Sequence, residues 1–452
     1  MHFKALVSVL ALSGVLAVTA TAPALAQTGV VDPPLAKSGN VELRAHIPGS
    51  AAGMNFKGHY AYVSGWGGIT VLDIAQPSRP QVVGMLPLPH FENEDVDLCG
   101  NKLIVVNDRA TRDLGALLYV VSIADPITPV VTAVMPLGLT GEGRGSGHIA
   151  NFVKRCSQLW VDGGDLVEVV DVSIPAAPRS LGKFESAASR SEAFRVTHDT
   201  ELDSTGTVWS VGGGGAAGYR LTANPLKPQF LAKTTNAGRN PGPYNDFILH
   251  NSQRRGNTLL ITEEDYIDTD EVPPGGCRGQ GKFETWDVSQ MGSGVIRPQG
   301  SWETELNGMF TDGSVDSKAP VTVNCSSHWF DAKHGVAAVG WYEQGVRFLD
   351  YRNPSRIRQV GYYIPANGST WAAYWAPTDP NQQIVYTADA YRGIDVLRIS
   401  GGGLDSRTRT APVAKPWFGS PTADAVSFQS HPTFGFMCPV LKPDVDTPTL
   451  GS

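Results

Sequence analysis

A proline-marked phrase recurs along this chain at a nearly constant interval, and that interval is the strongest constraint on its fold. Successive copies read LDIAQPSRPQVVG, VSIADPITPVVTA, VDVSIPAAPRSLG and YRLTANPLKPQFLA. Their first prolines, Pro77, Pro126, Pro175 and Pro225, are 49, 49 and 50 residues apart. Weaker copies are WDVSQMGSGVIRPQG and LDYRNPSRIRQVG, and GIDVLRIS ends at Ser400 as an incomplete copy. Such a repeat predicts modules in which equivalent residues occupy equivalent positions.

Each repeat contains four short apolar runs separated by turn residues, and no stretch shows sustained helical periodicity. In the first repeat the runs are GMNF, YAYVSG, ITVLDI and QVVGML. Four strands per repeat of about 40 to 50 residues are typical of a β-propeller blade. The phrase prolines suit the turn between the third and fourth strands, because their φ is preset for a turn. We predict an all-β, seven-bladed propeller whose blades begin near residues 49, 91, 143, 193, 244, 324 and 369.

The seventh repeat has only three strands, and a strand-like segment, VELRAHI (41–47), precedes the first repeat. We expect this N-terminal strand to complete the last blade and to close the ring, which would remove open strand edges. The domain organisation then has residues 27–40 as a linker, residues 41–400 as the propeller, and residues 401–452 as a tail rich in Gly, Pro, Ser and Thr.

Residues 1–26 have the pattern of a cleaved secretory signal peptide, so we expect a secreted, extracytoplasmic protein of bacterial type. A lysine, Lys4, precedes the apolar run ALVSVLALSGVLAV, and small residues, APALA, follow it. No later segment approaches the roughly 20 apolar residues of a membrane span. Without the signal the formal net charge is −7 − 1 = −8. A mildly acidic chain is a poor candidate for binding nucleic acid or an anionic membrane.

The recurring phrase resembles the cadence of the LVIVD-repeat family of secreted and surface β-propellers. LDIAQPSRPQVVG, VDVSIPAAPRSLG and LDYRNPSRIRQVG carry this resemblance, which extends over residues 41–400. It implies a propeller in an extracytoplasmic location and does not imply a particular activity. The chain departs from the cadence in blades four and five, which are two of the blades that carry the histidines described next.

Four histidines stand at matching places in four successive repeats. They are His148 in GSGHIANFV, His198 in FRVTHDTEL, His250 in FILHNSQRR and His328 in CSSHWFDAK. Because the first strand of each blade lines the channel, we expect the four imidazoles to meet at one level near one channel mouth. By alignment, the same level holds Gly53 in blade one, Glu94 or Asp95 in blade two, and Tyr374 in blade seven.

Converging imidazoles predict a transition-metal site, with iron, copper or zinc as the ion. Its plan is similar to that of the carotenoid-cleaving oxygenases, seven-bladed propellers with four channel histidines on one iron, although none of their sequence motifs is present. Metal-bound histidines usually have carboxylate partners. The candidates after second strands are Asp162, Glu263, Glu264 and Glu343, and Glu94 or Asp95 could join the ligands themselves.

Two insertions break the repeat and belong to the face with the histidines. They are residues 263–282, between the second and third strands of blade five, and residues 303–324, between blades five and six. A disulfide between Cys277 and Cys325 would tie these two loops into a lid. From blade register, Cys99 and Cys156 occupy matching first turns and would pair on the opposite face, which leaves Cys438 unpaired.

Two classes of function follow. The first is a metal-dependent oxidoreductase, or less favourably a hydrolase, that acts on a small organic substrate beneath the lid. The second is a non-catalytic binding or scaffold propeller that contacts a cell-surface protein or glycan through the same loops. For any single histidine, hydrogen bonding to a neighbouring blade is the simpler interpretation, but four at equivalent positions favour the metal. No nucleophile elbow of the G-x-S-x-G type supports a serine hydrolase.

Overall fold

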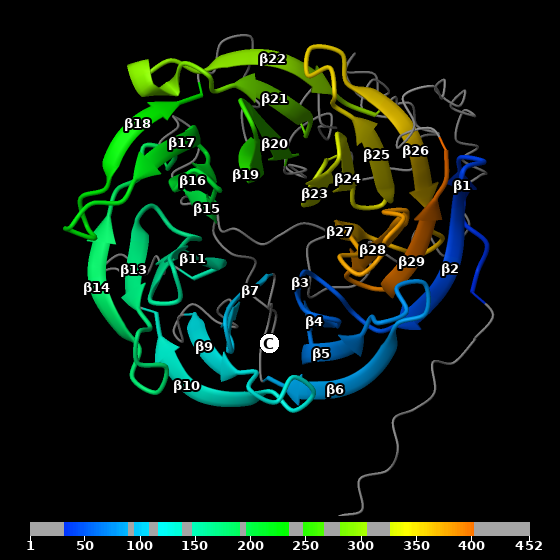
Figure 1. Cartoon of the computed structure of the whole chain (residues 1–452), viewed down its shortest axis with the longest axis horizontal. Helices are drawn as coiled ribbons and strands as arrows, with labels where there is room; N and C mark the ends of the chain where they lie inside the picture. Colours follow the sequence, from blue (N-terminus) through cyan, green and yellow to red (C-terminus); the bar gives the residue numbers. More distant parts are fainter. Residues whose placement is uncertain are drawn as a thin grey trace, which may run out of the picture.

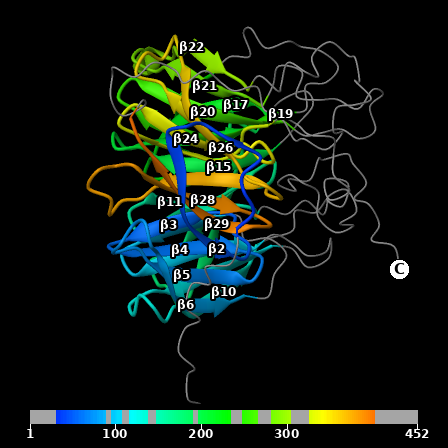
Figure 2. The same ribbon diagram turned by 90° about the vertical axis from the view of Figure 1, so that its right-hand side faces the viewer.

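The computed structural model is a ring of seven antiparallel sheets around a central channel (Figure 1), six of four strands and one of five, which confirms the predicted propeller. It describes residues 31–88, 95–107, 116–137, 147–189, 196–234, 247–265, 281–304 and 326–401. Seen from the side, the strands cross the thickness of the ring (Figure 2). The predicted signal peptide and the tail beyond residue 401 lie outside the described residues.

The first four blades follow the chain in order. Blade one contains β3 (Met54–Lys57), β4 (Tyr60–Gly65), β5 (Gly68–Asp73) and β6 (Gln81–Pro87). Blade two contains β7 (Val96–Cys99), β8 (Lys102–Asn107), β9 (Leu117–Ser122) and β10 (Val130–Pro136). Blade three contains β11 (Ala150–Lys154), β12 (Gln158–Val161), β13 (Val167–Asp171) and β14 (Arg179–Phe184). Blade four contains β15 (Thr197–Leu202), β16 (Thr207–Gly212), β17 (Gly215–Arg220) and β18 (Gln229–Lys233).

The last three blades include the closure of the ring. Blade five contains β19 (Phe247–Arg255), β20 (Thr258–Asp265), β21 (Phe283–Asp287) and β22 (Arg297–Trp302), with a short 3₁₀ helix, η1 (Met291–Ser293), before β22. Blade six contains β23 (Phe330–Lys333), β24 (Val336–Gly340), β25 (Val346–Asp350) and β26 (Arg358–Ile364). Blade seven contains β27 (Thr370–Trp375), β28 (Ile384–Asp389) and β29 (Gly393–Ile399).

The N-terminal strand closes the ring as predicted. β2 (Val41–Pro48) pairs antiparallel with β29 and is the outermost strand of blade seven. A second short strand, β1 (Ala36–Lys37), pairs with β26 and adds a fifth strand to blade six. Part of the segment expected to be a linker is therefore sheet. Close to the two ends of the described chain, the Ser38 N–H donates to the Tyr362 oxygen at 3.0 Å and the Ser400 N–H donates to the Asn40 oxygen at 2.9 Å.

Aspartates at the ends of third strands stabilise the turns that the proline phrase marks. The carboxylates of Asp73, Asp171, Asp287 and Asp350 each accept a hydrogen bond from the backbone N–H two residues later, at 2.8–3.0 Å. In such turns the side-chain oxygen accepts the hydrogen bond that a backbone carbonyl would accept in an ordinary turn. This is the physical reason why the phrase recurs with an acid before its proline in several blades.

Apolar side chains of neighbouring blades pack into shared clusters, which hold the ring together. One cluster joins Tyr62 and Val71 of blade one to Val105 and Val121 of blade two, and all four are almost fully buried. Because each blade packs on the next, the innermost strands stay in a common register around the channel. The innermost strands are β3, β7, β11, β15, β19, β23 and β27 (Figure 1).

Candidate metal centre

The four histidines lie at the start of neighbouring innermost strands and are buried. Their exposed fractions are 3% for His148, 0% for His198, 0% for His250 and 1% for His328. Moreover, the rings form a continuous series around the channel. Ring centroids are 4.7 Å apart for His148 and His198, 3.9 Å for His198 and His250, and 3.8 Å for His250 and His328. The four histidines that blade alignment predicted to share one level therefore lie side by side in the structure.

Each histidine stands where the pairing of the first and second strands is irregular. The register between β15 and β16 shifts at His198, and that between β19 and β20 shifts at His250. In blade six, the N–H of His328 donates to the Gly340 oxygen, while the Gly340 N–H donates to the Trp329 oxygen. Such bulges redirect a side chain relative to the regular alternation of a strand. The bulge is thus the local device that places each imidazole.

The same bulge identifies the equivalent residues in blades one and seven, and it corrects the alignment made from sequence. In blade seven the shift falls at Trp371, so Trp371 rather than Tyr374 stands at the histidine level. In blade one the hydrogen bonds of Ala52 and Gly53 with Ser64 match those of blade six, which places Ala52 rather than Gly53 there. A bulge adds one residue that strand alternation in the sequence does not reveal.

The polar contacts among the four histidines and Glu264 are made by the Nε2 atoms of the imidazoles. His148 Nε2 lies 3.0 Å from His198 Nε2. The Nε2 atoms of His250 and His328 face the Glu264 carboxylate, at 3.8 and 4.0 Å. One ligand atom each from His198, His250 and Glu264 lie within 4.8 Å of one another, so this group could hold a metal ion. The site therefore includes a carboxylate among its imidazoles.

Backbone carbonyls of the next blade determine which ring nitrogen carries the proton. His198 Nδ1 lies 3.2 Å from the oxygen of His250, and His328 Nδ1 lies 2.8 Å from the oxygen of Trp371. Because a carbonyl oxygen can only accept, Nδ1 must be the donor in both rings. The Nε2 atom of the neutral ring then keeps its lone pair, as a metal ligand requires.

Glu264 and Glu263 belong to β20 and not to the loop in which the sequence placed them. Their backbones pair with Ile248 and Leu249 of β19, so the insertion of blade five begins after them. Glu264 is fully buried. Glu263 instead holds the neighbouring backbone in place, because its carboxylate accepts the Lys282 N–H at 3.2 Å and its backbone oxygen accepts the Ser327 hydroxyl at 2.7 Å.

Tyr342 is a further residue of the site that sequence reasoning missed. Its hydroxyl donates a hydrogen bond to Glu264, and its ring centroid lies 4.9 Å from that of His328. Tyr342 is fully buried and has a φ of +43°, in the left-handed region that a bulky side chain rarely adopts. Such a conformation costs roughly 1–3 kcal/mol and is found mostly at functional sites. Glu264, near the end of β20, and Tyr342, two residues after β24, occupy matching positions in adjacent blades, which blade alignment could have revealed.

The remaining candidates occupy other places. Asp162 directly follows the second strand of blade three, next to His148, and burial raises its pKa to about 6, against the opposing effects of the Thr200 and Thr197 hydroxyls and His148. Glu343 lies in the turn between β24 and β25, half-buried. Asp95 and Tyr374 line the channel. Glu94 lies outside the described residues.

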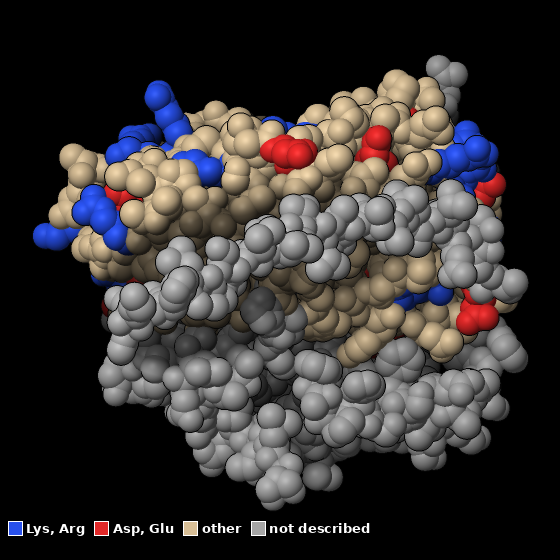
Figure 3. All heavy atoms as spheres, turned by 90° about the horizontal axis from the view of Figure 1, so that it is seen from below, with Lys and Arg blue, Asp and Glu red and all other residues tan. Residues whose placement is uncertain are grey.

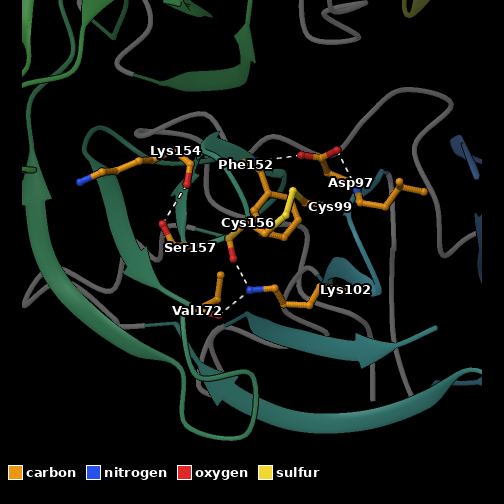
Figure 4. Close-up of a disulfide and its surroundings, with 9 residues drawn as sticks. Asp97, Cys99, Lys102, Phe152, Lys154, Cys156, Ser157 and Val172 are labelled. Carbon is orange, nitrogen blue, oxygen red and sulfur yellow. Dashed lines mark hydrogen bonds between the residues drawn. A yellow bond between two sulfur atoms is a disulfide. The ribbon is translucent and has the colours of Figure 1, made fainter. Parts of the chain in front are cut away.

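A disulfide joins Cys99 and Cys156, the pairing expected from blade register, at the opposite end of the innermost strands from the histidines (Figure 4). Beside it, the Phe152 N–H donates to the Asp97 carboxylate at 2.7 Å, and Lys102 Nζ donates to the oxygens of Val172 and Cys156. These bonds tie blade two to blade three. Cys277, Cys325 and Cys438, and hence the predicted lid disulfide, lie outside the described residues.

On the face seen in Figure 3, the charged side chains do not gather into one large patch of a single sign. In the view of Figure 3, Lys and Arg form separate groups and Asp and Glu are scattered, with uncharged surface between them. Within the described ranges, no helix is long and apolar enough to cross a membrane.

Comparison with known proteins supports the fold. The model of the LVIVD repeat family matches residues 48–86, which comprise almost all of blade one. The chain is thus a seven-bladed β-propeller that carries an LVIVD repeat. No curated protein sequence matches it.

Among solved structures, Raptor from Chaetomium thermophilum matches with a TM-score of 0.51 and 12% identity over 78% of this chain, which spans only 28% of the Raptor chain. A chain of the mitotic checkpoint complex matches with a TM-score of 0.50 and 12% identity, over 84% of this chain and 100% of that one. At these identities the likeness concerns the fold alone.

Proposed function

We propose that this propeller is a metal-dependent oxidoreductase whose ion is held by His148, His198, His250 and His328, with Glu264. The observation that carries the proposal is the convergence of Nε2 contacts from blades three to six on one buried level that also contains a carboxylate. A buried carboxylate beside neutral imidazoles is costly unless a positive charge compensates it. A divalent ion at this level would supply that charge.

The donor set favours a first-row transition metal and iron in particular. Two histidines and one carboxylate are the ligands of non-haem iron(II) oxygenases, and additional imidazoles also suit copper or zinc. When bound, such an ion supplies Lewis acidity and a site for dioxygen, which would be the oxidant for a small organic substrate. Zinc would instead indicate the hydrolytic alternative.

The chain itself would orient and shield the ligands. Backbone oxygens of His250 and Trp371 hold Nδ1 of His198 and His328, so that Nε2 is presented to the ion. Tyr342 donates to Glu264 and would hold its carboxyl group in place. Burial of all these groups excludes bulk water from the ligands. The site is therefore rigid before any ion binds, which favours affinity.

We further propose that the protein works outside the cytoplasm. A disulfide between Cys99 and Cys156 supports an oxidising compartment, and the LVIVD repeat and the predicted signal peptide point the same way. Fractionation of the native host with antibody detection tests this location, and recovery only with cytoplasmic markers would contradict it.

Metal analysis of the purified full-length protein tests the site. We expect about one equivalent of iron, copper or zinc per chain, by native purification or by reconstitution. The variant with all four histidines changed to alanine should lose it, whereas His59→Ala, on an exposed turn, should not. Less than about a tenth of an equivalent in the wild type under both conditions, or equal metal in the quadruple variant, would rule the site out. A folded protein without metal would leave the binding or scaffold propeller as the better account.

A further inference from the structure

A second layer of polar side chains lines the channel three residues along each innermost strand from the histidine level. We call it the polar ring. Its members are Asn55, Asp97, Asn151, Glu201, Gln253, Asp331 and Tyr374. They pair with Tyr62, Ile104, Trp160, Trp209, Leu260, Ala338 and Tyr386, which are equivalent residues of the seven second strands. One strand position in all seven blades is thus polar.

Acids and amides alternate around this ring. Carboxylates stand in blades two, four and six, amides in blades one, three and five, and the phenol of Tyr374 in blade seven. Some members of the polar ring form hydrogen bonds with residues of a neighbouring blade. Asn55 Nδ2 lies 3.3 Å from Asp97 Oδ1, and the Trp375 N–H donates to Asp331 Oδ2 at 3.0 Å. The three carboxylates are therefore spaced around the channel wall and separated by neutral side chains.

The polar ring encloses a chamber of about 460 Å³, and all seven members line it. Asp199, Asn251 and Trp329, which follow three of the histidines directly, line the end nearest the candidate metal centre. Among the lining residues that the structure describes, five are acids, Asp95, Asp97, Asp199, Glu201 and Asp331, and only Arg155 is basic. Arg255 lies close by, with Nη2 3.9 Å from Asp331. The chamber therefore has more acidic than basic side chains.

Aromatic rings accompany the acids. Phe56, Phe152, Trp329 and Tyr374 also line the chamber. Aromatic faces attract organic cations, and carboxylates bind their N–H groups. A volume of this size lies within the range of small-molecule sites, roughly 300–1,000 Å³. The composition thus fits an organic cation better than a neutral or anionic ligand.

A buried acceptor in the chamber points to a ligand that donates hydrogen bonds. Asn251 is 1% exposed, and its Nδ2 donates to Asp199 Oδ2 at 3.2 Å. Its Oδ1 has no hydrogen-bond partner among the described residues. Leaving such an acceptor without a donor is unfavourable. An N–H group of a ligand in the chamber would satisfy it.

A bare metal ion is a poorer occupant than an organic one. Within the described part of the chain, His198, His250 and Glu264 are the group whose ligand atoms converge within 4.8 Å, and no member of the polar ring is among them. The ring carboxylates therefore stand too far apart to chelate one ion directly. They can instead meet separate N–H groups of a larger cation.

We propose that the chamber binds a small organic compound with primary ammonium groups, held by Asp97, Glu201 and Asp331 and by the amide oxygen of Asn251. Binding does not require the metal ion, so it is a property separate from the proposed oxidoreductase activity. Because Asp199, Asn251 and Trp329 follow the histidines directly, the chamber adjoins the metal level, and an amine bound there lies next to it.

Isothermal titration calorimetry of the full-length protein, after removal of metal with a chelator, tests this proposal. The probes are 1,4-diaminobutane and its neutral counterpart 1,4-butanediol, which has almost the same shape. We expect saturable binding of the diamine at one site and none of the diol. The quadruple His→Ala variant should still bind the diamine, which separates this result from failure of the metal proposal.

Two variants locate the binding. Glu201→Gln and Asp331→Asn should each weaken diamine binding at least about tenfold, since each removes a carboxyl that a bound ammonium group would ionise and pair with, but retains the side-chain shape. Asp171→Asn, on the third strand of blade three and paired with Arg179, is the matched control and should bind as the wild type does. Circular dichroism and the unfolding temperature check that each variant is folded. No binding of the diamine by the folded wild type, equal binding of the diol, or unchanged binding in both ring variants would overturn the proposal.

Discussion

His328 Nδ1 lies 2.8 Å from the backbone oxygen of Trp371, the residue at the same level of the next blade. The Trp329 N–H donates to this same oxygen at 3.0 Å, so the acceptor is itself held in place. The contact links the orientation of a side chain in blade six to the backbone of blade seven. His198 makes the equivalent contact with His250.

This relationship predicts the tautomers of two rings. In the metal-free protein at neutral pH, we expect the neutral rings of His198 and His328 to carry their proton on Nδ1, because a carbonyl oxygen accepts it. Nitrogen-15 NMR of histidine-labelled protein distinguishes protonated from unprotonated ring nitrogens, and single His→Gln variants assign the signals. Signals that show Nε2 protonated and Nδ1 unprotonated in these rings would contradict the proposed direction of the ligands.

Tyr342→Phe should weaken metal binding without removing a ligand. The variant loses the hydroxyl that donates to Glu264, so the carboxylate is less well held as a ligand. Loss of an outer partner of a metal ligand typically lowers affinity about 10- to 100-fold. Competition with a chelator of known affinity measures the change. Tyr363→Phe, in β26 of the same blade, is a control for loss of a buried hydroxyl. Equal affinity of Tyr342→Phe and wild type would mean that Glu264 needs no such support.

Glu201→Gln should stabilise the protein at alkaline pH. Burial, together with the nearby carboxylates of Asp331 and Asp97, raises the Glu201 pKa from 4.5 to about 8, although Arg255 opposes this. Between these values the unfolded chain loses the proton and the folded chain retains it, so the stability of the wild type falls as the pH rises. The variant has no such loss.

Urea denaturation at pH 5 and at pH 8.5 measures this effect. We expect the difference in unfolding free energy between Glu201→Gln and wild type to grow by roughly 1–3 kcal/mol in favour of the variant over that interval. A difference that is constant with pH, or that shrinks, would show that the Glu201 carboxyl is not held in its neutral form.

Removal of the disulfide should destabilise the seam between blades two and three. The bridge closes a loop of 57 residues, and the chain-entropy model assigns about 4 kcal/mol to a loop of that length. The double variant Cys99→Ser and Cys156→Ser should therefore have a lower urea midpoint than the oxidised wild type. The wild type under reducing conditions should match the variant. Midpoints that do not differ would mean that the bridge contributes no stability.

A charge in the closing strand should open the ring. Val41 in β2 is 1% exposed and packs with Leu397 and Ile399 of blade seven. Val41→Asp buries an uncompensated carboxylate and should cost at least about 2–4 kcal/mol. Glu42→Ala, the next residue with its side chain exposed, is the matched control. We expect a lower unfolding temperature and faster aggregation for Val41→Asp alone, because an unclosed ring exposes strand edges.

Much of this protein follows from its sequence, because a repeat of about 49 residues with a proline turn defines one blade, and counting blades defines the ring. The missing fourth strand of the last blade and the segment 41–47 were enough to predict the closure. Matching contexts were enough to place His148, His198, His250 and His328 at one level. These conclusions depend on the order of strands and turns, which a repeat records directly.

The tertiary structure decided what depends on single-residue register and on contacts between blades. In a strand the side chains alternate, so one extra residue at a bulge changes which residue reaches the channel. That is why Trp371 takes the level assigned to Tyr374. Glu264 belongs to β20 because its backbone pairs with Ile248 of β19. The pairing of Tyr342 with Glu264 and the closure of seven polar residues into one ring both join different blades. Such contacts arise only when the ring closes, because the residues that make them are far apart in the chain.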